Sequence, residues 1–434
     1  MQINRRTFLK SAAVLAAAPL VVPARVLGRG GAVAPSERII AGGIGIGGRG
    51  THDLNWMLVE QDVQFVAVCD AQKSRREAAK NVVDTKYGNK DCAVSGDIRE
   101  FLATRTDIDA LLIATGDRWH ALASILAMKA GKDVYTEKPA CLTIAQGQAV
   151  VETAHRYARV YQTGAQRLSE PNHVFAIEMA RTGRLGPIHT AYADCRWRGG
   201  QRYDWLPEEP LPPKDEVDWD TWLGPCPWRP YNSAYVRGGG SWYGYYDLAT
   251  DVAMWGAHTV AQTLAGLDMS NVSTIEFEFA GPDATIMTRL SNGVKLVLYR
   301  VVGDVWKQCE FWHGACGERF DGPGGWTAAA DGYATTDVSS PALLLEYKKV
   351  LAEYVARTQR SLNHMRDFLD CVRSRRQAIA NPEVMFRSMA ICLAADICEQ
   401  LKRNVKFDLL KYEFIGDAEA NRLRSRPMRE PWRI

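Results

Sequence analysis

Short apolar runs alternate with helically spaced segments over the first third of the chain. The apolar runs predict buried strands at 39–46, 63–69, 109–114, 132–136 and 159–163. Between them, apolar residues recur at helical spacing, as at 120–130 and 143–158. Strands that alternate with helices predict an α/β domain with a parallel, doubly wound sheet. Ligands of such sheets bind at the carboxyl ends of the strands.

Beyond residue 166 the order changes to strands followed by helices. Alternating apolar positions predict strands at 273–279, 285–290, 294–300 and 308–313, and helical spacing predicts helices from about 341 to 402. This order is typical of an α+β domain. The predicted helix at 361–376 carries several arginines, which are expected to form a solvated face: Arg366, Arg373, Arg375 and Arg376.

The stretch 196–255 is rich in aromatic residues and is interrupted by prolines and glycines. Seven of the chain's 13 tryptophans lie between 197 and 255. We expect long ordered loops laid over a pocket, because aromatic faces stack on the C–H faces of sugars. Trp242 and Tyr246 are the candidate substrate-binding residues. A satellite core under a long loop, or a subunit interface, is the alternative.

The N-terminus combines two arginines with a short apolar run. Arg5 and Arg6 precede the apolar residues 12–22, which are too few to cross a hydrocarbon core, since about 20 are needed. The pattern resembles a twin-arginine (Tat) export signal. Residues 1–34 are therefore expected to be a signal and linker read by the Tat machinery, and the protein to be periplasmic or otherwise extracytoplasmic. A membrane-tethered form is the alternative.

Composition excludes some classes of partner. A net charge of +3 over 434 residues gives no reason to expect nucleic acid or an anionic membrane. The ten cysteines are scattered and form no CxxC pair. Because the chain is long enough to bury a core without cross-links, we predict few or no disulfides, and we assign no metal ligands.

A glycine-rich turn follows the first predicted strand. The sequence Gly45-x-Gly47-x-x-Gly50 opens a helical pattern, and Asp70 ends the second strand. This context is typical of a dinucleotide-binding motif. Gly45 permits the tight turn, Gly47 lets the backbone approach a diphosphate at the helix N-terminus, and Gly50 allows close packing. A glycine turn without a ligand is the alternative.

Asp70 indicates which dinucleotide binds. Its carboxylate can accept hydrogen bonds from the ribose hydroxyls of NAD, and its charge would repel the 2′-phosphate of NADP. NAD is therefore the predicted cofactor. NADP stays an alternative because three basic residues follow closely: Lys73, Arg75 and Arg76.

Three more motifs complete a recognisable set: "IATGDRWHA" (113–121), "GKDVYTEKP" (131–139) and "QTGAQR" (162–167). With the glycine turn and Asp70, they resemble the glucose–fructose oxidoreductase, inositol dehydrogenase and MocA (Gfo/Idh/MocA) family, in its exported bacterial branch. The resemblance implies a Rossmann domain at 36–165 and a substrate domain at 166–434 with an open, mainly antiparallel sheet. It also implies a homo-oligomer.

The resemblance assigns roles to residues at the expected cavity. Lys138 would move the proton of a substrate hydroxyl or carbonyl, with support from Glu137, and a lysine facing a positive nicotinamide ring would have a suitably lowered pKa. Thr115 and His120 would line the cofactor pocket, and Arg167 would lie near cofactor and substrate. The alternatives are that Lys138 is a surface lysine, that His120 is a structural histidine and that Arg167 forms an inter-domain salt bridge.

One segment departs from the family pattern. His258 matches a family histidine that normally has an aspartate one turn before it and another three residues after it, but these positions are Met254 and Ala261 here. Without a carboxylate partner His258 would be a weaker base. Asp251 and Asp247 are the candidates to replace it, and a structural role for His258 is the alternative.

Export and a dinucleotide site together constrain the function. Because no pool of free cofactor exists outside the cytoplasm, a bound cofactor must be regenerated within each cycle. We therefore predict an NAD(P)-dependent oxidoreductase that acts on a sugar or cyclitol hydroxyl or carbonyl. One alternative is NAD-assisted glycoside cleavage through a transient keto sugar and elimination. Another is a non-catalytic carbohydrate-binding protein with a vestigial Rossmann site.

Overall fold

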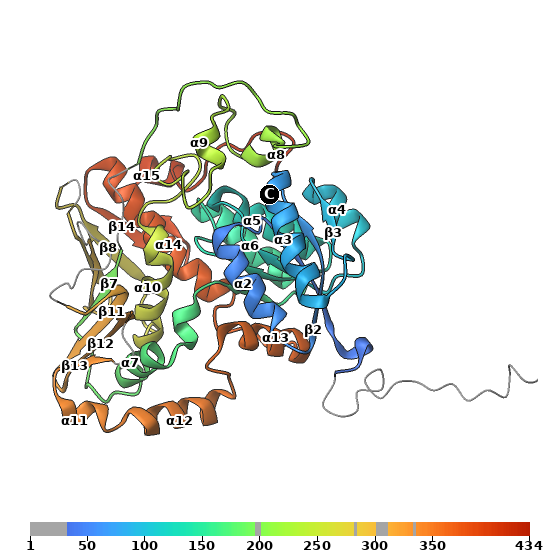
Figure 1. Cartoon of the computed structure of the whole chain (residues 1–434). Helices are drawn as coiled ribbons and strands as arrows, with labels where there is room; N and C mark the ends of the chain where they lie inside the picture. The colour runs from blue at the N-terminus through green and yellow to red at the C-terminus, as the bar shows by residue number, and fades with distance from the viewer. Residues whose placement is uncertain (1–32, 196–200, 282–283, 301–310, 333–335) are drawn as a thin grey trace, which may run out of the picture.

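The structure, a computed structural model, describes residues 33–434 apart from four internal gaps at 196–200, 282–283, 301–310 and 333–335 (Figure 1). The export segment at 1–32 and most of the strand predicted at 308–313 lie outside the described residues. Within them, two sheets stand side by side with helices packed between them (Figure 1).

The N-terminal sheet is parallel throughout, as the alternation of strands and helices predicts. Its strand order is β3-β2-β1-β4-β5-β6. The strands are β1 (Ile39–Ile44), β2 (Val63–Cys69), β3 (Ala93–Ser95), β4 (Ala110–Ile113), β5 (Asp133–Thr136) and β6 (Tyr161–Thr163). The order reverses between β1 and β4, which is where a doubly wound sheet opens a crevice for a ligand.

Helices cover both faces of this sheet. They are α2 (Gly48–Leu58), α3 (Lys73–Tyr87), α4 (Ile98–Thr104), α5 (Asp117–Lys129) and α6 (Ile144–Arg156), preceded by the short helix η1 (Pro35–Glu37). Local signals set their ends. The Thr143 hydroxyl accepts a hydrogen bond from the Gln146 N–H (3.1 Å) and caps α6, and Gly88 in a left-handed conformation ends α3.

In the described part of the chain, the second sheet has nine strands in the order β13-β12-β11-β7-β10-β9-β8-β14-β15. Among these strands only β7 and β10 pair in parallel, so the sheet is mainly antiparallel, as expected. The predicted homo-oligomer stays a prediction. The strands are β7 (Thr190–Asp194), β8 (Thr274–Glu278), β9 (Ile286–Leu290), β10 (Lys295–Tyr299), β11 (Ala315–Gly322), β12 (Gly325–Asp331), β13 (Asp337–Val338), β14 (Val405–Asp408) and β15 (Glu413–Phe414).

Helices α7 and α10 pack against the strands of this sheet, and α14 joins α10 to α6 of the Rossmann part. The interface between the two sheets is therefore one continuous apolar core. The helices of this half are η2 (Gln166–Ser169), α7 (Pro171–Arg181), α10 (Ala253–Gly266), α11 (Pro341–Leu344), α12 (Tyr347–Thr358), α13 (His364–Ser374), α14 (Pro382–Leu401) and α15 (Ala418–Arg422).

The expectation of a solvated arginine face holds for Arg373, Arg375 and Arg376, which are exposed, whereas Arg366 on α13 is half-buried. The apolar side of α13 joins the core formed by α2, α3 and one face of the Rossmann sheet. Arg366 Nη1 lies 2.8 Å from Asp62 Oδ1, and Arg373 also contacts Asp62. Arg375 Nη2 lies 3.0 Å from Asp133 Oδ1. Arg366, Arg373 and Arg375 therefore also join this segment to the N-terminal half through ion pairs, although Arg373 and Arg375 stay exposed.

Residues 201–248, here called the insert, form the aromatic stretch and carry two short helices, α8 (Trp219–Leu223) and α9 (Ser233–Val236). The insert has an apolar core of its own, built around stacked Trp219 and Trp222. It is attached to the start of α3, where the Lys73 N–H donates to the Glu216 carbonyl (2.9 Å). The insert therefore covers the crevice end of the Rossmann sheet (Figure 1).

Nine of the ten cysteines are described, and all nine are buried free thiols; Cys309 lies outside the described residues. Among the described residues, no helix has the length and apolar character needed to span a membrane.

Candidate active site

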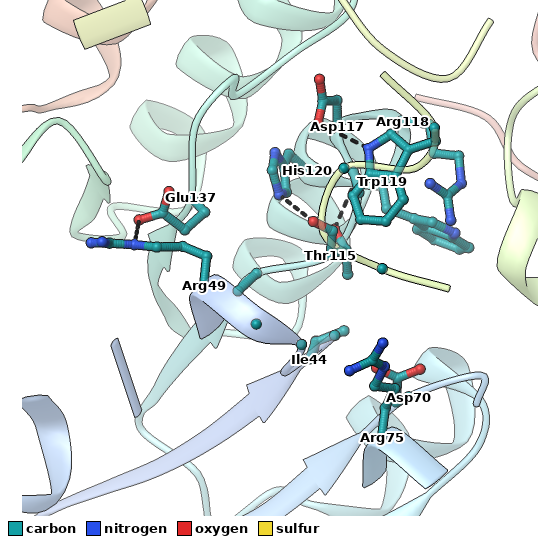
Figure 2. Close-up of a pocket in the computed structure, with 18 of the residues that line it drawn as sticks. Ile44, Arg49, Asp70, Arg75, Thr115, Asp117, Arg118, Trp119, His120 and Glu137 are labelled. Atoms are coloured by element: carbon teal, nitrogen blue, oxygen red, sulfur yellow. Dashed lines mark hydrogen bonds and ion pairs between the residues drawn. The ribbon is translucent and has the colours of Figure 1, made fainter. Parts of the chain in front are cut away.

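A cavity of about 370 Å³ opens at the carboxyl ends of β1, β2, β4 and β5. It extends from the glycine turn to the start of α10, and the insert forms part of its wall. Figure 2 shows Asp70 and Arg75 at one end of this cavity and Arg49 and Glu137 at the other. Ten of the twelve residues that the sequence nominates line it: Gly45, Gly47, Asp70, Thr115, His120, Glu137, Lys138, Arg167, Trp242 and His258.

Glycine stands at each of the three positions of the turn for a different structural reason. Gly45 has φ +71°, and a Cβ on it would lie 2.7 Å from the Thr115 Cα. A Cβ on Gly50 would lie 2.8 Å from the Ala114 Cβ, so Gly50 permits the packing of α2 on β4 and does not line the cavity. A Cβ on Gly47 would meet no atom within 4 Å, because it would enter the open space at the N-terminus of α2. That space fits a diphosphate.

Asp70 lies at the end of β2, where the ribose of a dinucleotide would bind. Its Oδ1 accepts a hydrogen bond from the Gln72 N–H (2.8 Å), and burial raises its pKa to about 6. The three basic residues that follow all contact the insert. Lys73 pairs with Glu216 (2.9 Å), Arg75 donates to the Arg237 carbonyl and Arg76 to the Asp215 carbonyl (2.8 Å each).

Arg118 is a buried cation between Asp70 and the insert. Its Nε donates to the Trp222 carbonyl (2.8 Å), and its guanidinium lies 3.5 Å from the centroid of the Trp222 ring. Burial lowers the pKa of Arg118 to about 10. Its Nη1 has no hydrogen-bond partner among the described residues, although Arg118 lines the cavity. An anionic group of a ligand would satisfy this nitrogen.

A polar cluster supports the other end of the cavity. Glu137 Oε1 accepts hydrogen bonds from Gln166 Nε2 (2.7 Å) and Arg49 Nε (3.3 Å), and Arg49 also pairs with the buried Asp53 (2.9 Å). Burial, and next the charge of Glu137, raise the pKa of Asp53 to about 9. This network fixes the strand end from which Lys138 projects.

Lys138 is half-buried, and its Nζ donates to the Met254 carbonyl (2.9 Å). Burial lowers the pKa of Lys138, and the ring of Trp255 lies 5.6 Å from Nζ. A lysine in this setting releases its proton more easily than a solvated one. It is therefore not the surface lysine that the sequence left as an alternative.

His258 projects from α10 into the same end of the cavity. Its Nε2 lies 3.2 Å from Arg167 Nη1, and Arg167 is itself held by a bidentate pairing with Asp331. Neither candidate replacement carboxylate lines the cavity: Asp247 pairs with Arg229, and Asp251 lies at the approach to α10. The partner of the histidine is thus a cation.

His120 lines the cavity as expected, whereas Tyr246 does not. Both ring nitrogens of His120 contact protein carbonyls, those of Pro139 (2.6 Å) and Thr115 (3.0 Å). His120 therefore holds the loops after β4 and β5 together. Tyr246 is not among the residues that line the cavity; it packs on Tyr203 and under Arg426.

The structure also adds residues that the sequence did not nominate. Arg49, Asp117, Arg118, Trp222, Trp255 and the glycines 238–240 all line the cavity. Arg118 was accessible to sequence reasoning, because it stands within the "GDRWH" motif. Trp222 and the glycines were not, since no local pattern shows which part of the insert reaches the crevice.

Comparisons with known proteins agree with this geometry. A model described as the oxidoreductase family, NAD-binding Rossmann fold (Gfo/Idh/MocA) matches residues 40–165. The oxidoreductase family C-terminal alpha/beta domain matches 344–434. The twin-arginine translocation signal matches 2–22.

Among curated proteins, a glycosyl hydrolase family 109 protein of Shewanella pealeana is 28% identical over 222 residues, 46% of this chain and 48% of the relative. An alpha-N-acetylgalactosaminidase of Shewanella oneidensis is also 28% identical over 222 residues, 45% and 47% of the two chains. The chain thus spans about half the length of the curated relatives it matches.

Two solved structures show the same fold. The WlbA dehydrogenase of Bordetella pertussis, in complex with NADH and UDP-GlcNAcA, has a TM-score of 0.57 at 14% identity. The match covers 85% of this chain and 98% of the dehydrogenase chain. An aldose-aldose oxidoreductase of Caulobacter crescentus has a TM-score of 0.53 at 16% identity, and the match covers 85% of this chain and 100% of the oxidoreductase chain.

Proposed function

Because the chain belongs to the Gfo/Idh/MocA oxidoreductase family, we propose that it is an exported oxidoreductase that holds NAD and acts on a hydroxyl or carbonyl of a sugar or cyclitol. One observation carries the proposal. A single cavity joins the open glycine turn at Gly47 to the half-buried Lys138 and the imidazole of His258. Cofactor and reacting groups therefore have one continuous space.

A bound nicotinamide dinucleotide supplies the hydride acceptor and donor for such a reaction. The amides at the start of α2 and the unpaired Nη1 of Arg118 would receive its diphosphate, and Asp70 would receive its ribose hydroxyls. The insert lines the same end with Thr221, Trp222 and Trp242. A cofactor enclosed in this way is retained after export, where no free pool exists to replace it.

NAD is favoured over NADP by the surroundings of Asp70. The basic residues that kept NADP an alternative each pair with the insert, at Glu216 or at backbone carbonyls. Lys73 and Arg76 are less available to a 2′-phosphate, whereas Arg75 also lines the cavity; a 2′-phosphate would in any case meet the Asp70 carboxyl. The proposed cofactor is therefore NAD.

Lys138 is the proposed proton shuttle. An amine with a lowered pKa can accept the proton of a substrate hydroxyl as the carbon is oxidised and return it on reduction. Its hydrogen bond to the Met254 carbonyl fixes the amine at the mouth of α10. Glu137 supports the backbone here through a contact with the Lys138 N–H (3.2 Å).

The names of the curated relatives favour a second candidate, NAD-assisted glycoside cleavage. In this scheme a sugar hydroxyl loses a proton and its carbon a hydride, which gives a ketone. The neighbouring C–H becomes acidic, its proton is removed and the glycosidic C–O bond breaks by elimination. Water then adds to the double bond and the ketone is reduced again, so no net redox change occurs.

The experiment uses protein purified from the periplasm. It is denatured, and the supernatant is assayed for NAD and NADP; the native protein is then offered monosaccharides and aryl glycosides. Hydride exchange between sugars supports the oxidoreductase, and aglycone release supports the glycosidase. Protein without dinucleotide and without turnover leaves the non-catalytic carbohydrate-binding alternative and overturns the proposal.

A variant pair tests the shuttle. Lys138→Ala should abolish either activity by more than about 10²-fold while NAD stays bound. Lys129→Ala, on the exposed end of α5, should change neither activity nor bound cofactor. Activity that survives in Lys138→Ala contradicts the assignment of Lys138.

A further inference from the structure

The hydrogen on the His258 ring can be located from the contact with Arg167. Arg167 Nη1 lies 3.2 Å from His258 Nε2. A guanidinium carries only donors, so Nε2 must be the acceptor in this contact. A neutral imidazole has one acceptor nitrogen and one N–H. The proton therefore belongs to Nδ1.

The surroundings of His258 disfavour the doubly protonated ring. An imidazolium would place a second N–H against the Arg167 guanidinium with no acceptor between them. The groups that act electrostatically on His258 are Arg167, Lys138, Arg49 and His364, and no carboxylate is among the leading ones. Together with burial they lower the pKa of His258 well below its usual value. His258 is thus neutral.

Arg167 is held in place by a second layer of buried charges. Both oxygens of Asp331 pair with its guanidinium. Behind Asp331 lies His173, whose Nε2 is 3.8 Å from Asp331 Oδ1 and whose Nδ1 is 2.9 Å from Glu318 Oε2. The side chains of His173 and Glu318 are fully buried. This layer keeps Arg167 directed at the imidazole.

The order of charges around His258 is the reverse of the usual order around a catalytic histidine. A carboxylate in direct contact makes an imidazole a stronger base. Here the carboxylate of Asp331 contacts the arginine, and the arginine contacts the histidine. Glu170, His173 and Asp331 offer ligand atoms within 4.8 Å of one another, but Asp331 is already paired, and we assign no ion to them.

The Nδ1 atom of His258 is buried and has no partner among the described residues, although the residue lines the cavity beside Lys138. A buried N–H without an acceptor points to a ligand that supplies one. We infer that His258 is a neutral hydrogen-bond donor, through Nδ1–H, to the reacting oxygen of the substrate, and that Arg167 enforces this tautomer. The inference rests on the proposed function and gives the two residues separate roles: Lys138 exchanges the proton, and His258 polarises the oxygen.

The tautomer is tested without activity. Protein labelled with ¹⁵N-histidine is examined by long-range ¹H–¹⁵N correlation spectra between pH 5.5 and 8.5, and His258→Asn identifies the His258 signals. We expect an unprotonated Nε2 and a protonated Nδ1 that do not change over this range. A ring that titrates, or a proton on Nε2, overturns the inference and leaves the proposed function standing.

Two substitutions test the donor role. Asn places an amide nitrogen near the Nδ1 position, so His258→Asn should keep activity within about 10-fold, whereas His258→Ala should lose about 10²–10³-fold in kcat. Equal losses in both variants, with NAD still bound, contradict a donor role. No activity in the wild-type protein would instead contradict the proposed function.

Asp331→Asn tests the enforcing role of Arg167. We expect the His258 signals of this variant to become a mixture of tautomers or to titrate, because Arg167 loses its anchor. A thermal unfolding curve accompanies the spectra to show that the variant is folded. An unchanged single tautomer in folded Asp331→Asn shows that the second layer does not enforce it.

Discussion

Asp396 holds the first turn of the helix that carries His258. It projects from α14, its Oδ1 accepts a hydrogen bond from the Val252 N–H (3.0 Å), and its Oδ2 has no partner among the described residues. Burial raises the pKa of Asp396 from 3.8 to about 7. A carboxyl that is hard to ionise in the folded protein makes stability depend on pH.

The sign of this pH dependence follows from the number of protons that the folded and the unfolded states bind. Between about pH 4 and 7 the folded state binds the Asp396 proton more tightly than the unfolded chain, so stability falls as pH rises through this window. The shift is about 3 pH units at about 1.4 kcal/mol each, or about 4 kcal/mol in full. From pH 5 to pH 8 the loss is about 3 kcal/mol, a change in Tm of about 3 °C for a chain of this size.

The substitution Asp396→Asn keeps the acceptor for Val252 and removes the ionisation. In thermal unfolding scans, we expect Asp396→Asn to have the Tm of the wild type at pH 4. At higher pH its Tm should be above that of the wild type, and this difference should be about 3 °C larger at pH 8 than at pH 5. Asp91→Asn, at an exposed site, should follow the wild type at every pH. Parallel curves for wild type and Asp396→Asn would refute the argument, because another group would then control the pH dependence.

Two further predictions concern the turn and the helix α13. Gly50→Ala should lower stability by about 1–3 kcal/mol, because its Cβ would lie 2.8 Å from that of Ala114. Gly47→Ala should carry no NAD, because its methyl group enters the diphosphate space, and should melt like wild-type protein stripped of NAD, since bound NAD stabilises the folded state. Thermal scans and release of bound NAD check both. Arg366→Ala should lose about 1–3 kcal/mol by denaturant unfolding, whereas exposed Arg376→Ala should stay within about 0.5 kcal/mol. Equal effects in either pair would contradict the packing argument behind it.

The sequence alone was sufficient for the parallel sheet apart from its edge strand β3, for the glycine turn and for the acidic residue that follows it. These features depend on contacts between neighbouring segments, and alternation and spacing encode such contacts directly. The same holds for Lys138, which a strand end carries to the crevice. The strands β11, β12 and β13 were not predicted, because their pairing involves the long-range order of a mixed sheet.

Only the tertiary structure decided what surrounds these residues. The partner of His258 is Arg167, 91 residues before it, and the anchor of Arg167 is Asp331, which lies 164 residues after Arg167. No local pattern predicts which of two oppositely charged side chains a fold brings to an imidazole. The same reason applies to α13, whose arginines pair with carboxylates more than 200 residues away. The local sequence identified the candidate reacting groups, and long-range packing determined the charges that surround them.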